Sequence, residues 1–169
     1  KTKETQIIKQ ADVVMLLHLM GEEFDEETTK LNYSYYEKRT LHGSSLSPSI
    51  YSIMGLKVGD DTKAYRYLRR AAFIDLINLQ KNTREGIHAA NAGGVWQTVV
   101  FGFAGLSIDA DGILNITPKM PKEWEGVTFR IHYLNSWLEI SIDAKNNAAV
   151  KVLEGAQTDV KVNGKLMRV

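Results

Sequence analysis

Residues 11–20 read Ala11-Asp12-Val13-Val14-Met15-Leu16-Leu17-His18-Leu19-Met20, and after Asp12 only His18 interrupts the apolar side chains. At helical spacing these side chains cover most of the circumference of a helix. A helix that is apolar nearly all round packs deep inside a layered assembly rather than on the surface of a small domain. Gly21 is a suitable residue to end it. The stretch therefore predicts a buried helix and a helical environment around it.

Further helices are predicted along the first part of the chain. Asp25 indicates the start of one, and Ser47-Pro48 the start of another, with Ser47 as the capping residue and proline at the first helical position. Asp61 is expected to cap a helix over residues 62–79. A last helix is expected over residues 89–104, where the Gly93-Gly94 pair indicates close packing or the approach of a ligand.

The period of the pattern changes to two near Leu106. Residues 113–116, 129–133 and 138–142 alternate as half-buried antiparallel strands do, and Asn163-Gly164 is a strong hairpin signal. We therefore predict an α+β fold, with helices in residues 1–106 and a small antiparallel, sandwich-like β domain in residues 107–169. The helices carry more apolar surface than that sheet can cover, so we interpret them as an arc of a larger helical barrel.

Composition excludes several classes of function. The chain has 169 residues, a formal net charge of +1 and no cysteine. The small charge gives no field that would select nucleic acid or membrane, and the lack of cysteine excludes disulfides and thiolate metal sites. The four histidines lack metal-ligand spacing, and no apolar run is long enough to span a bilayer. We expect a cytoplasmic protein without a metal or cofactor.

Three stretches carry polar groups in arrangements suited to ligand binding. Lys9-Gln10-Ala11-Asp12 precedes the apolar helix and could bind sugar hydroxyls, although for this segment alone capping by Asp12 and solvation of Lys9 are the commoner explanation. Residues 42–48, His-Gly-Ser-Ser-Leu-Ser-Pro, lead into a helix N-terminus, which favours an anion such as phosphate. A capped loop without ligand is the alternative. Residues 86–97 contain His88 and Trp96, which could contact an anion and a sugar ring or simply belong to a core.

The ordered set of these strings resembles glycoside hydrolase family 65. The strings that carry the resemblance are Lys9-Gln10-Ala11-Asp12-Val13, Tyr35-Tyr36-Glu37, residues 42–48, 86–90, 93–96 and 100–106, and residues 118–124, Pro-Lys-Met-Pro-Lys-Glu-Trp. The resemblance covers essentially the whole chain and implies part of an (α/α)6-barrel catalytic domain followed by a β domain. The family includes phosphorylases of maltose, trehalose, kojibiose and nigerose, and some hydrolases.

The resemblance also implies roles for individual residues. Lys9 and Gln10 would hold the glucosyl unit, and the phosphate would be bound by His42, Ser44, Ser45 and His88. The catalytic glutamate, the general acid, is expected upstream of Lys1, so no catalytic residue is assigned in this chain. Expected partners are an α-linked glucose disaccharide, inorganic phosphate as co-substrate, the remainder of the enzyme and, in the complete enzyme, a second copy in a homodimer.

The implied reaction is inverting phosphorolysis of the maltose phosphorylase type, which gives β-glucose 1-phosphate. An inverting hydrolase needs a carboxylate base to activate water, whereas a phosphorylase needs donors that position phosphate. No carboxylate lies between His42 and Pro48, although Glu37 and Glu85 are not far away in sequence. The alternatives are a family hydrolase such as a trehalase, and a non-catalytic carbohydrate-binding or structural module in which the β half supplies the function.

Overall fold

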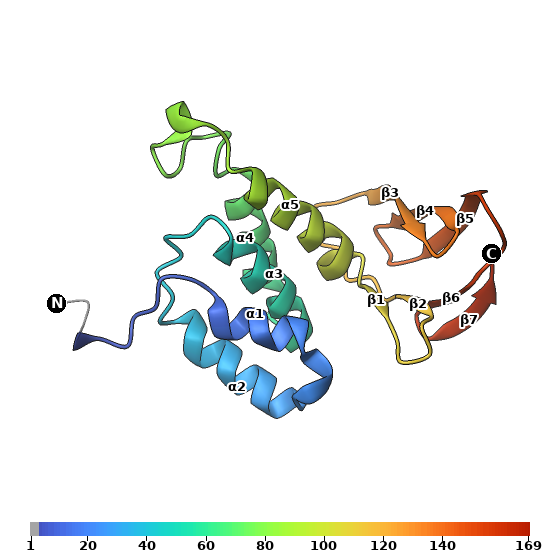
Figure 1. Cartoon of the computed structure of the whole chain (residues 1–169), viewed down its shortest axis with the longest axis horizontal. Helices are drawn as coiled ribbons and strands as arrows, with labels where there is room; N and C mark the ends of the chain where they lie inside the picture. Colours follow the sequence, from blue (N-terminus) through green and yellow to red (C-terminus); the bar gives the residue numbers. More distant parts are fainter. Residues whose placement is uncertain (1–3) are drawn as a thin grey trace. The chain divides into compact units, whose positions relative to one another are not determined.

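The computed structural model describes residues 4–169 and divides the chain into two compact units, with Val99 in the first and Val100 in the second. The first unit is helical and the second consists mainly of strands, which confirms the predicted α+β class. Figure 1 shows the elements of each unit.

The helical unit is built around helix α3. Its helices are α1 (Asp12–Leu19), α2 (Glu26–Glu37), α3 (Ser47–Val58), α4 (Asp61–Ala72) and α5 (Ala89–Gln97), with 3-10 turns η2 (Gly21–Glu23) and η3 (Thr83–Glu85). A π-helix, η4 (Thr98–Phe103), continues α5 across the boundary between the units. Helix α3 contacts α1, α2, α4 and α5, and residues 47–56 are all buried (Figure 1). The other helices therefore pack around α3.

The apolar surface of α1 is only partly covered in this chain. Val14 and Leu17 are buried against α2 and α3, whereas Leu16, Leu19 and Met20 are 44%, 71% and 49% exposed. The helix was predicted to be buried all round, and within the described residues it is buried on one side. The arrangement fits part of a helical barrel.

The helix starts show which capping predictions were correct. Asp25 caps α2, since its carboxylate accepts a hydrogen bond from the backbone N of Thr28 at 2.6 Å. Ser47 was predicted to cap α3, and this was wrong: Leu46 occupies the cap position and Ser47 is already the first helical residue. Asp60, rather than Asp61, caps α4 by accepting from the backbone N of Lys63 at 3.2 Å.

Helix α4 is shorter than predicted. It ends at Ala72 instead of continuing to residue 79, and the following residues form a series of turns. Asn78 and Lys81 adopt left-handed backbone conformations, with φ of 48° and 59°, which a right-handed helix cannot contain. As a result Leu76, within the predicted helix, is 78% exposed.

The second unit contains two sheets. One has the strand order β1 (Leu106–Ile108), β2 (Leu114–Ile116), β6 (Asp159–Val162), β7 (Lys165–Arg168), and the other is β3 (Gly126–Tyr133), β4 (Ser136–Asp143), β5 (Ala148–Glu154). The predicted turn at Asn163-Gly164 is present, with positive φ at both residues, and Asn146 in the turn between β4 and β5 also has a positive φ. Leu114, Ile116 and Val160 of the first sheet share one core with Leu138, Ile140 and Ile142 of β4. The unit is thus a small sandwich.

One strand pair departs from the predicted antiparallel arrangement. β2 and β6 pair in parallel, with Leu114 opposite Val160 and Ile116 opposite Val162. A parallel pair needs a long crossover connection, and here the whole β3–β4–β5 sheet lies between the two strands in sequence. The alternation of apolar and polar side chains within a strand does not indicate whether a distant partner strand runs parallel or antiparallel to it.

Two adjacent glycines of α5 are predicted to respond in opposite ways to alanine. A Cβ on Gly94 would lie 2.8 Å from Oγ and 3.0 Å from Cβ of the buried Ser49, whereas one on Gly93 would meet nothing within 4 Å. Gly93→Ala should raise the free energy of unfolding of the helical unit by about 0.5–1 kcal/mol because alanine favours helix. Gly94→Ala should lower it by about 1–2 kcal/mol through overpacking.

Urea unfolding followed by circular dichroism at 222 nm measures both changes. Equal effects of the two substitutions would contradict the close packing of α5 on α3.

Candidate functional site

A short backbone ladder places the Lys9-Gln10 segment beside the loop that follows α2. The backbone N of Ile8 donates to the carbonyl of Arg39 at 3.0 Å, and the backbone N of Leu41 donates to the carbonyl of Ile8 at 2.9 Å. The next residues on the two segments are Lys9-Gln10 and His42. Lys9 and Gln10 are exposed, and the Gln10 amide donates to Asp12 at 3.0 Å. Two of the predicted binding segments are therefore neighbours.

His42 lies inside a cluster of tyrosine rings. The residue is 8% exposed, and its ring centroid is 4.8 Å from that of Tyr51 and 4.9 Å from that of Tyr67. Burial, and then the neighbouring Arg70 guanidinium, lower the pKa of His42 to about 4. His42 is consequently a neutral imidazole at pH 7 and carries no charge toward a phosphate.

The hydrogen bonds around His42 determine which ring nitrogen carries the proton. The Tyr67 hydroxyl donates its only hydrogen to Glu37 Oε1 at 2.9 Å, so its oxygen can only accept from His42 Nε2, 3.0 Å away. His42 Nδ1 is then the unprotonated nitrogen, and it is buried without a hydrogen-bond partner. This nitrogen can accept a hydrogen bond but cannot donate one to an anion.

Ser44 and Ser45 lie at the entrance of α3, half-buried. Ser44 Oγ accepts from the backbone N of Leu46 at 3.3 Å, which orders the turn before the helix. At the start of α3 the backbone N of Ser47 donates to the carbonyl of Ser44 at 3.4 Å and Pro48 has no N–H, so the donors next to this helix start are chiefly the Ser44 and Ser45 hydroxyls. Ser47 Oγ is buried without a hydrogen-bond partner.

His88 immediately precedes α5 and is held by Asp75. Its Nδ1 is 2.5 Å from Asp75 Oδ1, and its backbone N donates to Asp75 Oδ2 at 2.8 Å. Its Nε2 faces Asn82 Nδ2 at 3.4 Å. The two hydrogen bonds to Asp75, the side-chain one first, lower the pKa of Asp75. His88 is only partly buried, with 22% of its side chain exposed.

Helix α4 and the turn that follows it contact both histidines. Tyr67 contacts His42, Arg70 donates to the carbonyl of His42 at 3.4 Å, and Asp75 binds His88. Within the described residues no hydrogen bond joins His88 to Ser44 or Ser45. Sequence reasoning missed Tyr67 and Asp75, whose partners lie 25 and 13 residues away and leave no local signal.

Trp96 of α5, considered as a platform for a sugar ring, is 49% exposed. This exposure does not support the alternative prediction that Trp96 belongs to a core. It lies two residues after Gly94, on the helix that packs against α3.

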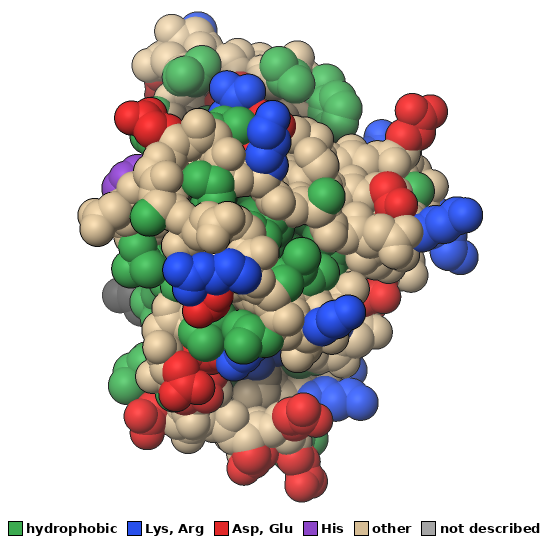
Figure 2. All heavy atoms as spheres, turned by 90° about the vertical axis from the view of Figure 1, so that its right-hand side faces the viewer, with side chains coloured by type: hydrophobic (Ala, Val, Ile, Leu, Met, Phe, Trp, Pro, Cys, Tyr) green, Lys and Arg blue, Asp and Glu red, His purple; other side chains and the backbone are tan. Residues whose placement is uncertain are grey.

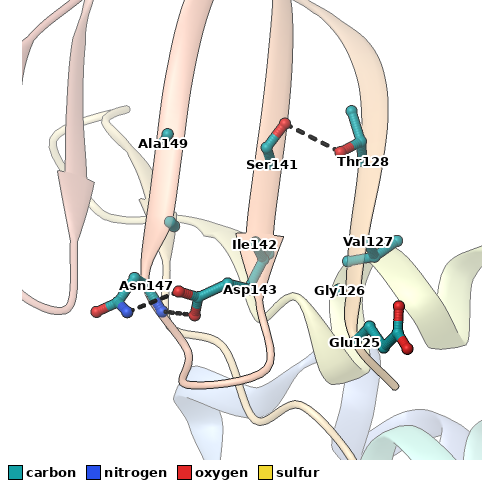
Figure 3. A pocket seen from close by; sticks show the side chains of 10 residues that line it. Glu125, Gly126, Val127, Thr128, Ser141, Ile142, Asp143, Asn147 and Ala149 are labelled. Atoms are coloured by element: carbon teal, nitrogen blue, oxygen red, sulfur yellow. Dashed lines mark hydrogen bonds between the residues drawn. The ribbon is translucent and has the colours of Figure 1, made fainter.

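An open groove of about 500 Å³ lies on the β3–β4–β5 sheet and contains none of the predicted site residues (Figure 3). Thr128 of β3 and Ser141 of β4 are directly opposite each other in the sheet and are hydrogen-bonded at 3.0 Å. Asp143 accepts from the backbone and side chain of Asn147, which lowers its pKa. Because these polar groups already satisfy one another, the groove is not our candidate site.

Two further classes of site were considered in residues 4–169. This part of the chain contains no group of three or more His, Asp or Glu side chains able to hold a metal ion. None of its helices has the length and apolar character needed to cross a bilayer. Acidic and basic side chains are intermixed on the face shown in Figure 2, with no stripe of one sign that would indicate a nucleic-acid site.

The buried His42 predicts a pH dependence of stability. Its pKa in the folded state, about 4, lies below the ordinary 6.5, so between these values the unfolded chain binds a proton that the folded chain does not. The free energy of unfolding should therefore be highest above pH 6.5 and fall by up to about 3 kcal/mol as the pH decreases toward 4. His42→Gln, which retains an N–H donor toward Tyr67, should show a weaker dependence.

Urea unfolding of the two proteins between pH 4 and 7 measures this difference. Proton NMR of the His42 ring provides the control, and a titration midpoint near 6.5 would contradict the burial of the ring.

Comparison with known proteins places these features in a family. The profile described as the central catalytic domain of glycosyl hydrolase family 65 matches residues 1–97, and that of the family's C-terminal domain matches residues 108–169. Kojibiose phosphorylase from Caldanaerobacter subterraneus subsp. tengcongensis is 56% identical over 99% of this chain and 22% of its own length. Maltose phosphorylase from Bacillus subtilis is 37% identical over 86% of the chain and 19% of its own.

A solved structure from the human microbiome, assigned as a kojibiose phosphorylase, agrees in fold with a TM-score of 0.89. It is 41% identical, and the match covers 98% of this chain and 24% of that one. The chain thus spans about a fifth of the length of the curated relatives it matches. On both family profiles and the structural agreement, the chain belongs to glycosyl hydrolase family 65.

Proposed function

We propose that the chain forms the phosphate-binding part, and a portion of the glucosyl-binding part, of an inverting disaccharide phosphorylase. The relatives described above are disaccharide phosphorylases, and the donor groups at the starts of α3 and α5 suit an anion. The reaction would transfer a glucosyl group from an α-linked disaccharide to inorganic phosphate and give β-glucose 1-phosphate. The general acid would come from a segment of the enzyme outside this chain.

The observation that carries the proposal is that two carboxylates, Glu37 and Asp75, are already bound to other side chains. Glu37 Oε1 accepts from Tyr67 at 2.9 Å, and Glu37 Oε2 is 3.2 Å from the Lys63 ammonium. Asp75 is bound at both oxygens by His88. An inverting hydrolase needs a carboxylate free to take a proton from water. These two carboxylates are already engaged, whereas the half-buried hydroxyls of Ser44 and Ser45 are suited to positioning phosphate.

The proposed roles differ among the predicted phosphate ligands. Ser44, Ser45 and His88 would donate directly to phosphate. His42 is neutral and presents an acceptor nitrogen, so we assign it the shaping of the loop rather than a charge contact. Lys9 and Gln10, exposed beside this loop, would hold the glucosyl unit.

The linkage of the disaccharide is proposed from the relatives. The maltose phosphorylase type was expected from the sequence, yet the kojibiose phosphorylase described above shares more identity with the chain than the maltose phosphorylase does. We therefore propose kojibiose ahead of maltose as the substrate.

A chimera tests the proposal. The chain would replace the matching segment of the 56%-identical kojibiose phosphorylase. Ser45→Ala in this chimera should raise the KM for phosphate about tenfold, the effect of losing roughly 1.4 kcal/mol from a hydrogen bond to a charged group. The KM for kojibiose should change much less. Ser34→Ala, an exposed serine of α2, is the matched control.

The hydrolase alternative has its own test in the same chimera. Glu85 is exposed and accepts no side-chain hydrogen bond among the described residues, so it is the carboxylate that could serve as a base. Sugar release that continues without phosphate and is lost in Glu85→Gln would establish hydrolysis and exclude our proposal. Release that requires phosphate in both proteins supports it.

A further inference from the structure

Asp75 binds one residue through both of its carboxylate oxygens. Oδ1 lies 2.5 Å from His88 Nδ1, and Oδ2 accepts from the backbone N of His88 at 2.8 Å. Asp75 belongs to the turns after α4, and His88 stands at the start of α5, so the contact joins two elements 13 residues apart. Holding the ring and the backbone of one residue together fixes both its position and its rotation.

The polarity of these bonds determines the tautomer of His88. The lowered pKa of Asp75 leaves it ionised at neutral pH, and an ionised carboxylate only accepts hydrogen bonds. His88 Nδ1 must therefore carry a hydrogen. Nε2 is the nitrogen left for a ligand, since its one neighbour, Asn82 Nδ2, is 3.4 Å away at the limit of a hydrogen bond.

We propose that Asp75 is a positioning residue that holds His88 with Nδ1–H toward the carboxylate and Nε2 toward the phosphate. The proposal rests on the phosphate role assigned to His88 above. With Nδ1–H held by Asp75, Nε2 can donate to a phosphate oxygen only in a ring that carries a hydrogen on both nitrogens. The Asp75 carboxylate behind the ring keeps Nε2 oriented toward the phosphate in front.

The substitution Asp75→Asn distinguishes a positioning role of Asp75 from a purely structural one, because only a positioning role determines the tautomer of His88. The amide side chain introduced by Asp75→Asn has nearly the same shape as the carboxylate but only one acceptor oxygen. The backbone N–H of His88 can only donate a hydrogen bond, so the amide oxygen of the introduced side chain would accept from it. The amide NH₂ would then face His88 Nδ1. His88 Nδ1 would then become the acceptor and its hydrogen would move to Nε2.

Nitrogen-15 NMR of the 169-residue chain, labelled in its histidine rings, detects this change. The unaltered chain should show the Nδ1–H tautomer of the His88 ring, and Asp75→Asn should show the Nε2–H tautomer. Glu85→Gln, which removes a nearby carboxylate that does not contact His88, is the matched control and should keep the Nδ1–H form. An unaltered chain with the Nε2–H tautomer would falsify the proposal.

The kinetic consequence is measured in the chimera described above. Asp75→Asn should raise the KM for phosphate about tenfold, by analogy with the loss on removing a carboxylate behind a metal-binding histidine. The KM for the disaccharide should remain nearly unchanged. Asp75→Glu keeps two acceptor oxygens, so it should retain the Nδ1–H tautomer and restore part of the phosphate affinity; it also serves if Asp75→Asn does not fold.

The two measurements separate this proposal from the proposed function. An inverted tautomer with an unchanged KM for phosphate overturns the contribution of the Asp75 carboxylate to phosphate binding, because the Nε2–H of the inverted ring can still donate to phosphate. A KM for phosphate that is also unchanged in His88→Ala would overturn the phosphate role of His88. A tautomer that stays the same in Asp75→Asn overturns the positioning role itself, whatever the kinetics show.

Discussion

The burial of α3 is the constraint on which the helical unit depends. Residues 47–56 have almost no contact with solvent, and α1, α2, α4 and α5 are the elements that surround them. A helix buried from its first residue requires the preceding loop to end inside the protein. The loop at residues 42–46 is therefore anchored at one end by α3 and at the other by the ladder to Ile8. Its donors can be fixed in place without secondary structure of their own.

The features that the sequence predicted correctly are those determined by near neighbours. Asp25 accepts from Thr28, three residues away, so its capping role is visible in the sequence. The turn at Asn163-Gly164 likewise follows from the backbone preferences of two residues. The failures depend on distant residues. Neither the end of α4 at Ala72 nor the parallel pairing of β2 with β6 is decided by the side chains of the element itself.

The candidate site shows the same division. The loop of residues 42–46, which contains Ser44 and Ser45, was recognisable from its composition. Small hydroxyl residues followed by proline are typical of a helix N-terminus. The contacts that set the state of each histidine were not recognisable. Tyr67 lies 25 residues from His42 and Asp75 lies 13 residues from His88, and each is an ordinary residue of a predicted helix when considered in sequence alone.

The two histidines illustrate why residue type alone does not define a role. Tyr67, fixed by Glu37, requires His42 to donate through Nε2, so burial leaves a neutral ring with an acceptor at Nδ1. Asp75 requires the opposite arrangement at His88, with the hydrogen on Nδ1 and Nε2 turned to a partly exposed position. An anion can use the second arrangement once the ring is protonated. It gains no charge contact from the first, because the His42 ring is neutral and its acceptor nitrogen is buried.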